Sequence, residues 1–546
     1  MGFKRTLVLQ VTYTFLAHFG YGLMVLQTMS RRAACAGRGL CNWHRMAAVG
    51  VTVSVTLCVY FLSGPPAERE DGLTALPFFL APAEPATGGH PQRGGLPSAA
   101  DESGSRMTVR GGKIPGSGWH LDAAPPGTYA SKHIHRVTLL SEACLPKIDG
   151  VTKTLFLVAQ HNLNLGRDVL IVCPATSLYG FRENDPVLLP KRTEPLAAGQ
   201  PEPSIRVVGT TSFAPPNLPY ETRLGLPSLD ALKAVSDFNP DVVQMFSPFV
   251  IAWLGVWFKR QRPEIALIAN FQTDIVGMMA EYRYPAILEA AVWAVFRGVH
   301  NPADLTLSPS HFMTRRLRPV GINRLRLWIR GIDTRNFNPG KASNKTRRLL
   351  LNGRPESTLS AVYVGRVADE KHCELLIDVA KLDGVQLTIV GDGPARPALE
   401  ALMAGTSAQF LGMVVGDELP SLYASADLFV FTGTAETAGN VVREAVASGT
   451  PVLLPNSGGV VDTVLDGLNG YLCEPEPRAF AEKVAMLRDN RVHLREMSVN
   501  AVRLTPLIPS WVKVMETLEH FYEEAYQRAK SVASGSAPRE DRGLSG

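Results

Sequence analysis

The sequence of 546 residues lacks several patterns that would assign it to a functional class. Its seven cysteines are scattered without any CxxC pair, which disfavours a structural zinc site or a disulfide scaffold. The Gly-rich dinucleotide fingerprint is missing from its first strand-loop-helix unit, which argues against a nicotinamide-dependent oxidoreductase. The net charge of +5 has its excess near the N-terminus, so the remainder is near neutral and does not suit a nucleic-acid partner.

Acidic residues are absent before Glu68, whereas lysines and arginines occur throughout that stretch. Within it, residues 46–63 form an uncharged, mostly apolar run that is just long enough to span a bilayer. Arginines precede the run and acidic residues follow it, so the positive-inside rule places the N-terminus in the cytoplasm. We expect a single-pass anchor within residues 1–64, which would place the protein in a membrane. An organelle membrane of plastid or Golgi type is among the candidate locations. An organelle-targeting peptide is the alternative.

The rest of the sequence divides into a linker, two α/β domains and a tail. Residues 65–132 are rich in Pro, Gly, Ala and Ser, which is typical of a disordered linker. Short apolar strands alternate with helix-length segments over residues 133–335 and again over residues 336–510. This alternation predicts two Rossmann-like domains with parallel sheets. Residues 511–546 are expected to hold an amphipathic C-terminal helix and a tail.

Two glutamates, eight positions apart, mark the candidate ligand site of the second domain. Glu436 lies in a polar loop after a buried strand, and Glu444 lies about one turn inside the next helix. Open α/β sheets bind ligands at this edge. A helix start favours a diphosphate, and Gly439 and Asn440 would let the backbone approach it. A carboxylate only accepts hydrogen bonds, so Glu444 suits a ribose diol and Glu436 suits sugar hydroxyls, unless both are merely solvated surface residues.

The segment ETAGNVVREAVASGTPV, residues 436–452, resembles the E-x7-E signature of glycosyltransferase family 4. The resemblance extends over roughly residues 141–528. It implies the GT-B fold, in which two Rossmann-like domains face each other across a cleft and the C-terminal helix crosses back onto the first domain. In this sequence the GT-B part would follow the N-terminal anchor. The resemblance also implies retaining transfer of a hexosyl group from a nucleotide sugar.

The same resemblance implies further site residues. GRVADEK, residues 365–371, resembles the phosphate clamp of the family. Arg366 and Lys371 match its basic positions and would stabilise the diphosphate as it leaves. Gly150 resembles the glycine of the first βα turn, which approaches the donor phosphate and the acceptor. Gly412 resembles the place where the nucleobase edge meets backbone atoms.

One position departs from the usual pattern of the family. Gln272, in the segment NFQTDI, stands where many relatives carry a His that contacts the sugar near the reacting bond. Gln can hydrogen-bond a hydroxyl group but cannot titrate, so a step that depends on an imidazole is excluded at this position. The Gln-Thr-Asp form occurs in some bacterial mannosyltransferase-like relatives, so activity is still expected. An inert loop residue is the alternative.

The overall resemblance is to plant and bacterial sulfolipid synthases, which transfer sulfoquinovose from a UDP donor to diacylglycerol. GDP-mannose-dependent mannosyltransferases that act on glycolipids resemble it nearly as much. We therefore expect hexosyl transfer to a hydroxyl group of a membrane glycerolipid, with Glu436, Gln272, Arg366 and Lys371 as catalytic residues. The alternatives are mannosyl transfer to a glycolipid and a catalytically impaired nucleotide-sugar-binding protein. No cofactor or metal is expected, because no carboxylate cluster demands one.

Overall fold

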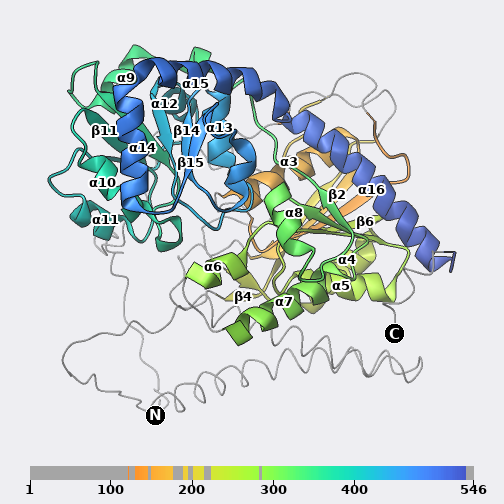
Figure 1. Ribbon diagram of the computed structural model, residues 1–546. Coiled ribbons are helices and arrows are strands. Elements are labelled where there is room, and N and C mark those ends of the chain that lie inside the picture. The colour runs from red at the N-terminus through yellow and green to blue at the C-terminus, as the bar shows by residue number, and fades with distance from the viewer. Residues whose placement is uncertain are drawn as a thin grey trace, which may run out of the picture.

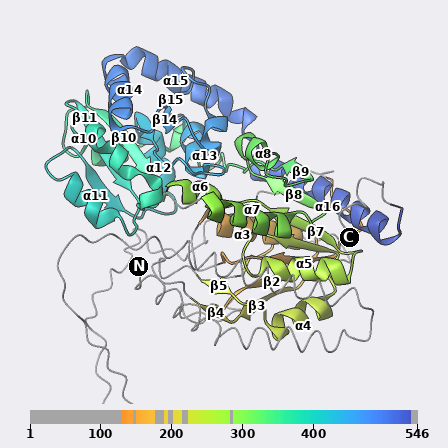
Figure 2. The ribbon, with the colours of Figure 1, turned by 60° about the horizontal axis from the view of Figure 1, so that its bottom comes forward.

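The computed structural model describes residues 121, 129–144, 149–175, 189–194, 201–213, 223–281 and 286–536. These residues form two α/β domains, each built on a parallel sheet, and the domains lie side by side in both views (Figures 1 and 2). No helix in this part of the chain is long and apolar enough to cross a membrane. The predicted anchor within residues 1–64 lies outside the described residues.

The first domain contains a seven-stranded sheet with the order β3-β2-β1-β6-β7-β8-β9, in which all neighbouring strands are parallel. A short antiparallel pair, β4 with β5, lies outside this sheet. Its elements in chain order are β1 (Arg136–Leu140), α3 (Gly150–Asn164), β2 (Asp168–Pro174), β3 (Ile205–Thr210), β4 (Ser212–Phe213), β5 (Leu224–Gly225), α4 (Leu229–Phe238), β6 (Val242–Met245), α5 (Ala252–Gln261), β7 (Ala266–Asn270), α6 (Ile275–Glu281), α7 (Ala286–His300), β8 (Leu305–Ser308), α8 (His311–Leu317) and β9 (Leu325–Leu327).

The second domain contains a six-stranded parallel sheet with the order β12-β11-β10-β13-β14-β15. Its elements are η2 (Pro339–Lys341), α9 (Asn344–Leu351), β10 (Leu359–Val364), η3 (Asp369–Lys371), η4 (Cys373–Leu376), α10 (Ile377–Ala380), β11 (Val385–Val390), α11 (Arg396–Leu402), β12 (Gln409–Gly412), α12 (Glu418–Ser425), β13 (Leu428–Val430), α13 (Asn440–Ala447), β14 (Val452–Pro455), η5 (Gly459–Thr463), β15 (Gly470–Cys473), α14 (Pro477–Asp489), α15 (Arg491–Leu504) and η6 (Thr505–Leu507).

The central strands are fully buried because helices cover both faces of each sheet. All six residues of β10 and all six of β11 are buried. Such strands read as nearly continuous apolar runs rather than as alternating ones, which is why they are recognisable in the sequence. The strands of each sheet are parallel, so the loops that follow their carboxyl ends all lie at one edge of that sheet. This arrangement brings the loops that carry the candidate site residues together.

Residues 373–380 are helical, but this helix is irregular. The chain forms the 3-10 turn η4 and then a single α-helical turn, α10. Cys373, Leu376 and Val379 are all buried in the second-domain core. Cys373 and Leu376 lie three residues apart within η4, which matches the period of a 3-10 helix, whereas Val379 belongs to α10. The turn starts from His372, which adopts the left-handed conformation with φ of 51°.

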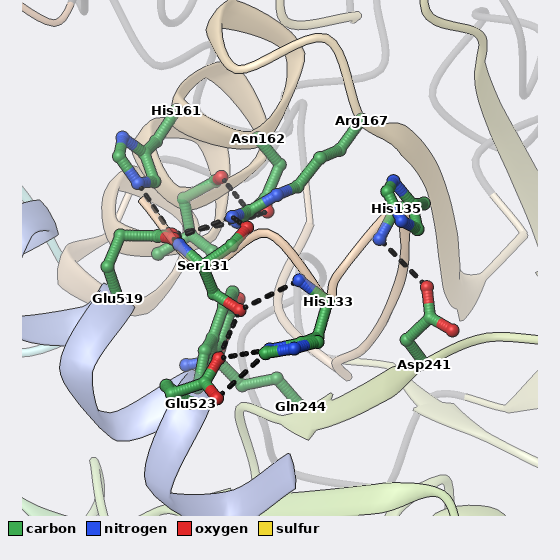
Figure 3. A network of polar contacts seen from close by, with 12 residues as sticks. Ser131, His133, His135, His161, Asn162, Arg167, Asp241, Gln244, Glu519 and Glu523 are labelled. Atoms are coloured by element: carbon green, nitrogen blue, oxygen red, sulfur yellow. Dashed lines mark hydrogen bonds and ion pairs between the residues drawn. The ribbon is translucent and has the colours of Figure 1, made fainter. Parts of the chain in front are cut away.

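The last helix, α16 (Trp511–Ala533), leaves the second domain and lies along the first, as Figures 1 and 2 show. Its apolar face packs into the same core as β1, β2 and β6. Glu519 lies at the centre of this contact (Figure 3). Its carboxylate accepts hydrogen bonds from both terminal nitrogens of Arg167, at 2.8 and 2.6 Å, and from His161 at 3.0 Å. The helix is therefore attached to the first domain by a buried ion pair as well as by apolar packing.

Packed structure begins before residue 133, although the sequence assigned residues 65–132 to a linker. The amide of Ser131 donates to Glu519 at 3.0 Å, and its hydroxyl donates to Glu523 (Figure 3). Tyr129 stacks on His520, with ring centroids 4.5 Å apart, and Leu121 is buried in the core beneath α16. The partners lie almost 400 positions away in the sequence, so composition alone did not indicate them.

Candidate active site

The candidate site lies between the domains, where the loop after β13 meets the loop after β7. The hydroxyl of Thr437 donates to the backbone carbonyl of Gln272 at 2.8 Å, which joins the two loops directly. Both loops follow carboxyl ends of parallel strands, the edge at which open α/β sheets bind ligands. Figure 2 shows α13 at this junction, close to α8 of the first domain.

Two glycines allow the close packing of the loops around α13. Gly439 precedes the helix with φ of 68°, a left-handed conformation that side-chain-bearing residues rarely adopt. A Cβ atom there would also lie 2.6 Å from Cγ1 of Val460. A Cβ atom at Gly459 would collide with the backbone carbonyl of Thr437. The loop after β14 can therefore rest directly on the loop that carries Glu436.

Two ion pairs hold the cations that the sequence assigned to the site. Lys371 pairs with Glu436, so the structure brings two of the predicted residues together. Arg366 pairs with Glu370, and its guanidinium group is about half exposed. Burial alone would raise the pKa of Glu370, but Arg366 outweighs this effect and the pKa lies below its usual value. Both cations lie at the carboxyl end of β10 and already have carboxylate partners.

Glu444 is buried at the contact between the domains. Its Oε2 atom accepts a hydrogen bond from the Tyr423 hydroxyl at 3.1 Å. Its Oε1 atom lies 3.6 Å from Nζ of Lys153, which comes from α3 of the first domain. Burial raises the pKa of Glu444, and the positive charge of Lys153 and the Tyr423 hydrogen bond act in the opposite direction. Next to this pair, a Cβ atom at Gly150 would lie 3.0 Å from the side-chain nitrogen of Asn440.

Known proteins resemble both domains. Residues 148–336 match the family model described as Glycosyltransferase Family 4, and residues 358–490 match the model described as Glycosyl transferases group 1. The chain is 34% identical over 402 residues to the GDP-mannose-dependent alpha-mannosyltransferase of Mycobacterium tuberculosis, and the match covers 73% of this chain and 99% of that relative. The chain belongs to glycosyltransferase family 4. It is therefore a glycosyltransferase, as the E-x7-E segment indicated.

Two further comparisons give one more sequence relative and one structural neighbour of this family 4 glycosyltransferase. It is 35% identical over 280 residues to the sulfoquinovosyl transferase SQD2 of Arabidopsis thaliana, which covers 50% of this chain and 54% of that relative. The structure resembles sucrose-phosphate synthase of Thermosynechococcus elongatus with a TM-score of 0.56 and 19% identity, covering 72% of this chain and 99% of the other. The second likeness concerns the fold, and it confirms the GT-B arrangement of two domains.

Gln272 and Gly412, both predicted as site residues, lie in different places in the structure. The Gln272 side chain is buried, and its Nε2 atom has no hydrogen-bond partner among the described residues. A buried, unsatisfied donor of this kind is costly unless a ligand or water pairs with it. Gly412 ends β12 with φ of 69°, and its carbonyl accepts from the amide of Gly391 at 2.8 Å. Gly412 therefore lies beside the turn after β11 rather than against Glu444.

The sequence analysis missed three residues of this site. Lys153 and Tyr423 both contact the Glu444 carboxylate, and Thr437 bonds to the loop of Gln272. Tyr423 occupies an ordinary helical position with no motif around it. Lys153 lies three positions after Gly150 and Thr437 follows Glu436 directly, so nearness to a predicted site residue was the usable signal for these two. In the described part of the glycosyltransferase, no group of three or more His, Cys, Asp or Glu side chains is arranged to hold a metal ion.

Proposed function

We propose that this glycosyltransferase moves a hexosyl group from a nucleotide sugar to a hydroxyl group of a lipid or glycolipid acceptor, and that GDP-mannose is its donor. The observation that supports the proposal best is that two carboxylates and a glycine of the opposite domain all lie close to the start of α13. Glu444 and Glu436 flank this helix start, and Gly150 approaches it from the opposite domain. A helix start, two carboxylates and nearby cations offer complementary partners to the diphosphate, ribose and sugar of such a donor.

The nucleotide end of the donor fits the inner part of the site. Glu444 is buried and acceptor-only when ionised, so it suits the two hydroxyl groups of a ribose. The diphosphate would lie at the start of α13, where the backbone N–H groups of the first helical turn point outward and Gly150 of the opposite domain lies close by. The side-chain oxygen of Asn440 is buried and has no partner among the described residues, which supports a polar ligand at this point.

The two clamp cations would exchange partners when the donor binds. Lys371 is paired with Glu436 and Arg366 with Glu370, so a diphosphate competes with two carboxylates for them. Arg366 can bind a phosphate through two parallel N–H groups, whereas Lys371 acts as a point charge. Release of Glu436 from Lys371 would free its carboxylate to accept from sugar hydroxyls. Both cations stabilise the negative charge that develops on the leaving diphosphate.

The sugar end of the donor would lie between Glu436 and Gln272. The unpartnered Nε2 atom of Gln272 is a donor for a sugar hydroxyl, so the residue positions the sugar rather than transferring a proton. The family resemblance implies retention at the anomeric carbon. The site offers positioning groups and charge-neutralising groups, which can contribute through proximity and orientation. The expectation that the reaction needs no cofactor or metal stays a prediction.

The donor base separates two versions of the proposal. The M. tuberculosis GDP-mannose-dependent mannosyltransferase matches this chain over 99% of its own length, and this coverage favours GDP-mannose. The Gln-Thr-Asp form at Gln272 favours the same choice. A UDP-linked sugar such as UDP-sulfoquinovose is the second candidate, because the 35% identity to the sulfoquinovosyl transferase is comparable although it spans only 54% of that relative.

A lipid acceptor agrees with the proposed membrane location, for which the N-terminal segment 1–64 would supply a single-pass anchor. An organelle membrane of plastid or Golgi type is part of this proposal. We expect the full chain to sediment with membranes and a chain that starts at residue 119, just before the buried Leu121, to be soluble and to unfold cooperatively. Fractionation and thermal melting check this. If the shortened chain also sediments with membranes, residues 1–64 are not needed for anchoring. If it aggregates while the full chain in detergent does not, the N-terminal region belongs to the fold.

Replacing Glu444 by alanine should weaken nucleotide binding, because two ribose hydroxyl groups would lose their buried acceptor. Lost hydrogen bonds of this kind cost about 1–3 kcal/mol. Calorimetry with GDP and UDP measures the effect, with melting temperature as the check on folding. Glu496→Ala, an exposed residue of α15, is the matched control and should bind as the wild type does. An alanine variant that keeps wild-type affinity for the preferred nucleotide would remove Glu444 from the donor site.

A further inference from the structure

Lys153 is the residue of the first domain that reaches the buried carboxylate of the second. It lies on α3, one turn after Gly150, and its ammonium nitrogen is 3.6 Å from Oε1 of Glu444. The Lys153 side chain is 21% exposed and the Glu444 side chain 10%, so water screens the pair only weakly. The adjacent approach of Gly150 to Asn440 shows that α3 and α13 meet closely at this point.

Every charged or titratable group that faces Glu444 comes from a different element. Tyr423 of α12 donates its hydroxyl to Oε2, and Lys153 of α3 faces Oε1. Asp333, in the connector between the domains, adds a negative charge that opposes ionisation of Glu444. Burial opposes ionisation most strongly, and Lys153 is the one positive charge among these neighbours that favours it. Without Lys153, burial and Asp333 would push the carboxyl toward its protonated form.

The charge state of Glu444 decides what it can do for a nucleotide. An ionised carboxylate offers acceptors on both oxygens, and Tyr423 uses part of this capacity. A protonated carboxyl carries its own donor and can no longer accept two ribose O–H groups equally well. Because Lys153 and Glu444 belong to different domains, their contact forms where the two domains meet. The ribose acceptor is therefore completed by a side chain outside its own domain.

We propose that Lys153 is a positioning residue for the nucleotide donor: from the opposite domain it holds the Glu444 carboxylate ionised and oriented toward the ribose. This inference rests on the proposed donor site, in which Glu444 binds the ribose. It makes nucleotide affinity dependent on the approach of the two domains, because the positive charge reaches Glu444 only when α3 and α13 are in contact. Lys153 acts through Glu444 and needs no contact with the reacting atoms.

The test measures nucleotide affinity as a function of pH for the full chain in detergent. The ligands are GDP with guanosine, or UDP with uridine, according to which nucleotide the wild type binds. The variants are Lys153→Met, Lys153→Arg and Glu444→Gln, and the control is Lys233→Met, an exposed lysine of α4. An opposite charge at this distance lowers a carboxyl pKa by about one unit or more, so Lys153→Met should bind more weakly, and the loss should approach about tenfold at the acidic end of the pH range.

The loss should shrink as the pH rises, because Glu444 then ionises without help. Lys153→Arg should retain affinity across the range, and Lys233→Met should match the wild type. The nucleoside should show the same loss as the diphosphate, since Lys153 acts through the ribose acceptor. A loss that is equal at every pH would indicate a merely structural role, and a loss seen only with the diphosphate would indicate a direct phosphate contact. Either result overturns the inference.

A different pattern identifies failure of the proposed function itself. If the folded wild type binds neither GDP nor UDP, or if Glu444→Gln binds as the wild type does, Glu444 is not the ribose acceptor and the inference falls with the proposal. If Glu444→Gln weakens binding while Lys153→Met has no effect at any pH, the donor site stands and only the role of Lys153 is wrong.

Discussion

Replacement of Glu519 by alanine is expected to destabilise the protein by roughly 3–5 kcal/mol, the usual result of removing one partner from a buried ion pair. Glu519 is fully buried and satisfies both terminal nitrogens of Arg167, His161 and the amide of Ser131 (Figure 3). The alanine variant would leave the buried Arg167 guanidinium without its carboxylate. The loss of stability should be greatest in α16 and in the segment that packs beneath it. Thermal and denaturant unfolding measure this loss.

The matched control for this prediction lies on the same helix. Glu524 forms a surface ion pair with Arg326, and Glu524→Ala should change stability by only about 0–1 kcal/mol.

The pH dependence of stability gives a second readout of the role of Glu519. Burial alone would raise the pKa of Glu519, but the hydrogen bonds from His161 and Arg167 outweigh it and lower the pKa to about 2. The stabilisation is therefore present above the ordinary value of 4.5 and is lost as the pH falls toward 2. If Glu519→Ala and Glu524→Ala lower the free energy of unfolding by the same amount, the stabilising role of Glu519 is contradicted.

Replacement of Arg366 by alanine is expected to lower kcat at least tenfold while raising the donor KM less. Charge on the leaving diphosphate grows as the sugar–phosphate bond breaks, and interactions that strengthen in the transition state appear in turnover. A tenfold loss corresponds to about 1.4 kcal/mol. The Arg366 side chain is about half exposed but its partner Glu370 is buried, so melting temperature is measured beside the kinetics to show that the variant remains folded. Steady-state kinetics with the preferred donor checks the prediction.

Two variants serve as comparisons for Arg366→Ala. Arg366→Lys should recover only part of the activity, because the charge remains but the two parallel N–H groups are lost. Arg478 forms an exposed pair with Glu482 on α14, and Arg478→Ala should leave turnover unchanged. A folded Arg366→Ala enzyme with wild-type kcat would remove Arg366 from the clamp and would weaken the assignment of Lys371 with it.

Local patterns were sufficient to predict the two α/β domains and part of the candidate site. Apolar runs bounded by loops indicated the buried strands, because parallel strands covered on both faces carry few polar residues. Glu436 and Glu444 were recognisable because a strand, a loop and a helix start lie within one short segment. Glu436 and Lys371 were each predicted for the site from separate motifs, 65 positions apart, but their ion pair with each other was not predicted.

The remaining features depend on contacts between distant segments. Lys153 meets Glu444, and Arg167 meets Glu519 352 positions away, through packing that no local pattern encodes. Ser131 was assigned to a linker by composition, yet α16 provides its partners.

Sugar transfer from defined donors to membrane lipids is the measurement that tests the account most directly. The full chain in detergent would be supplied with radiolabelled GDP-mannose, UDP-glucose or UDP-sulfoquinovose and with extracted lipids as acceptors. The account predicts label in the lipid fraction from GDP-mannose, reduced at least tenfold by Arg366→Ala and unaffected by Arg478→Ala. If the folded protein labels lipid from a UDP-linked sugar and not from GDP-mannose, the proposed donor is wrong, and if it binds a nucleotide but labels lipid from none of these donors, the proposed function is wrong.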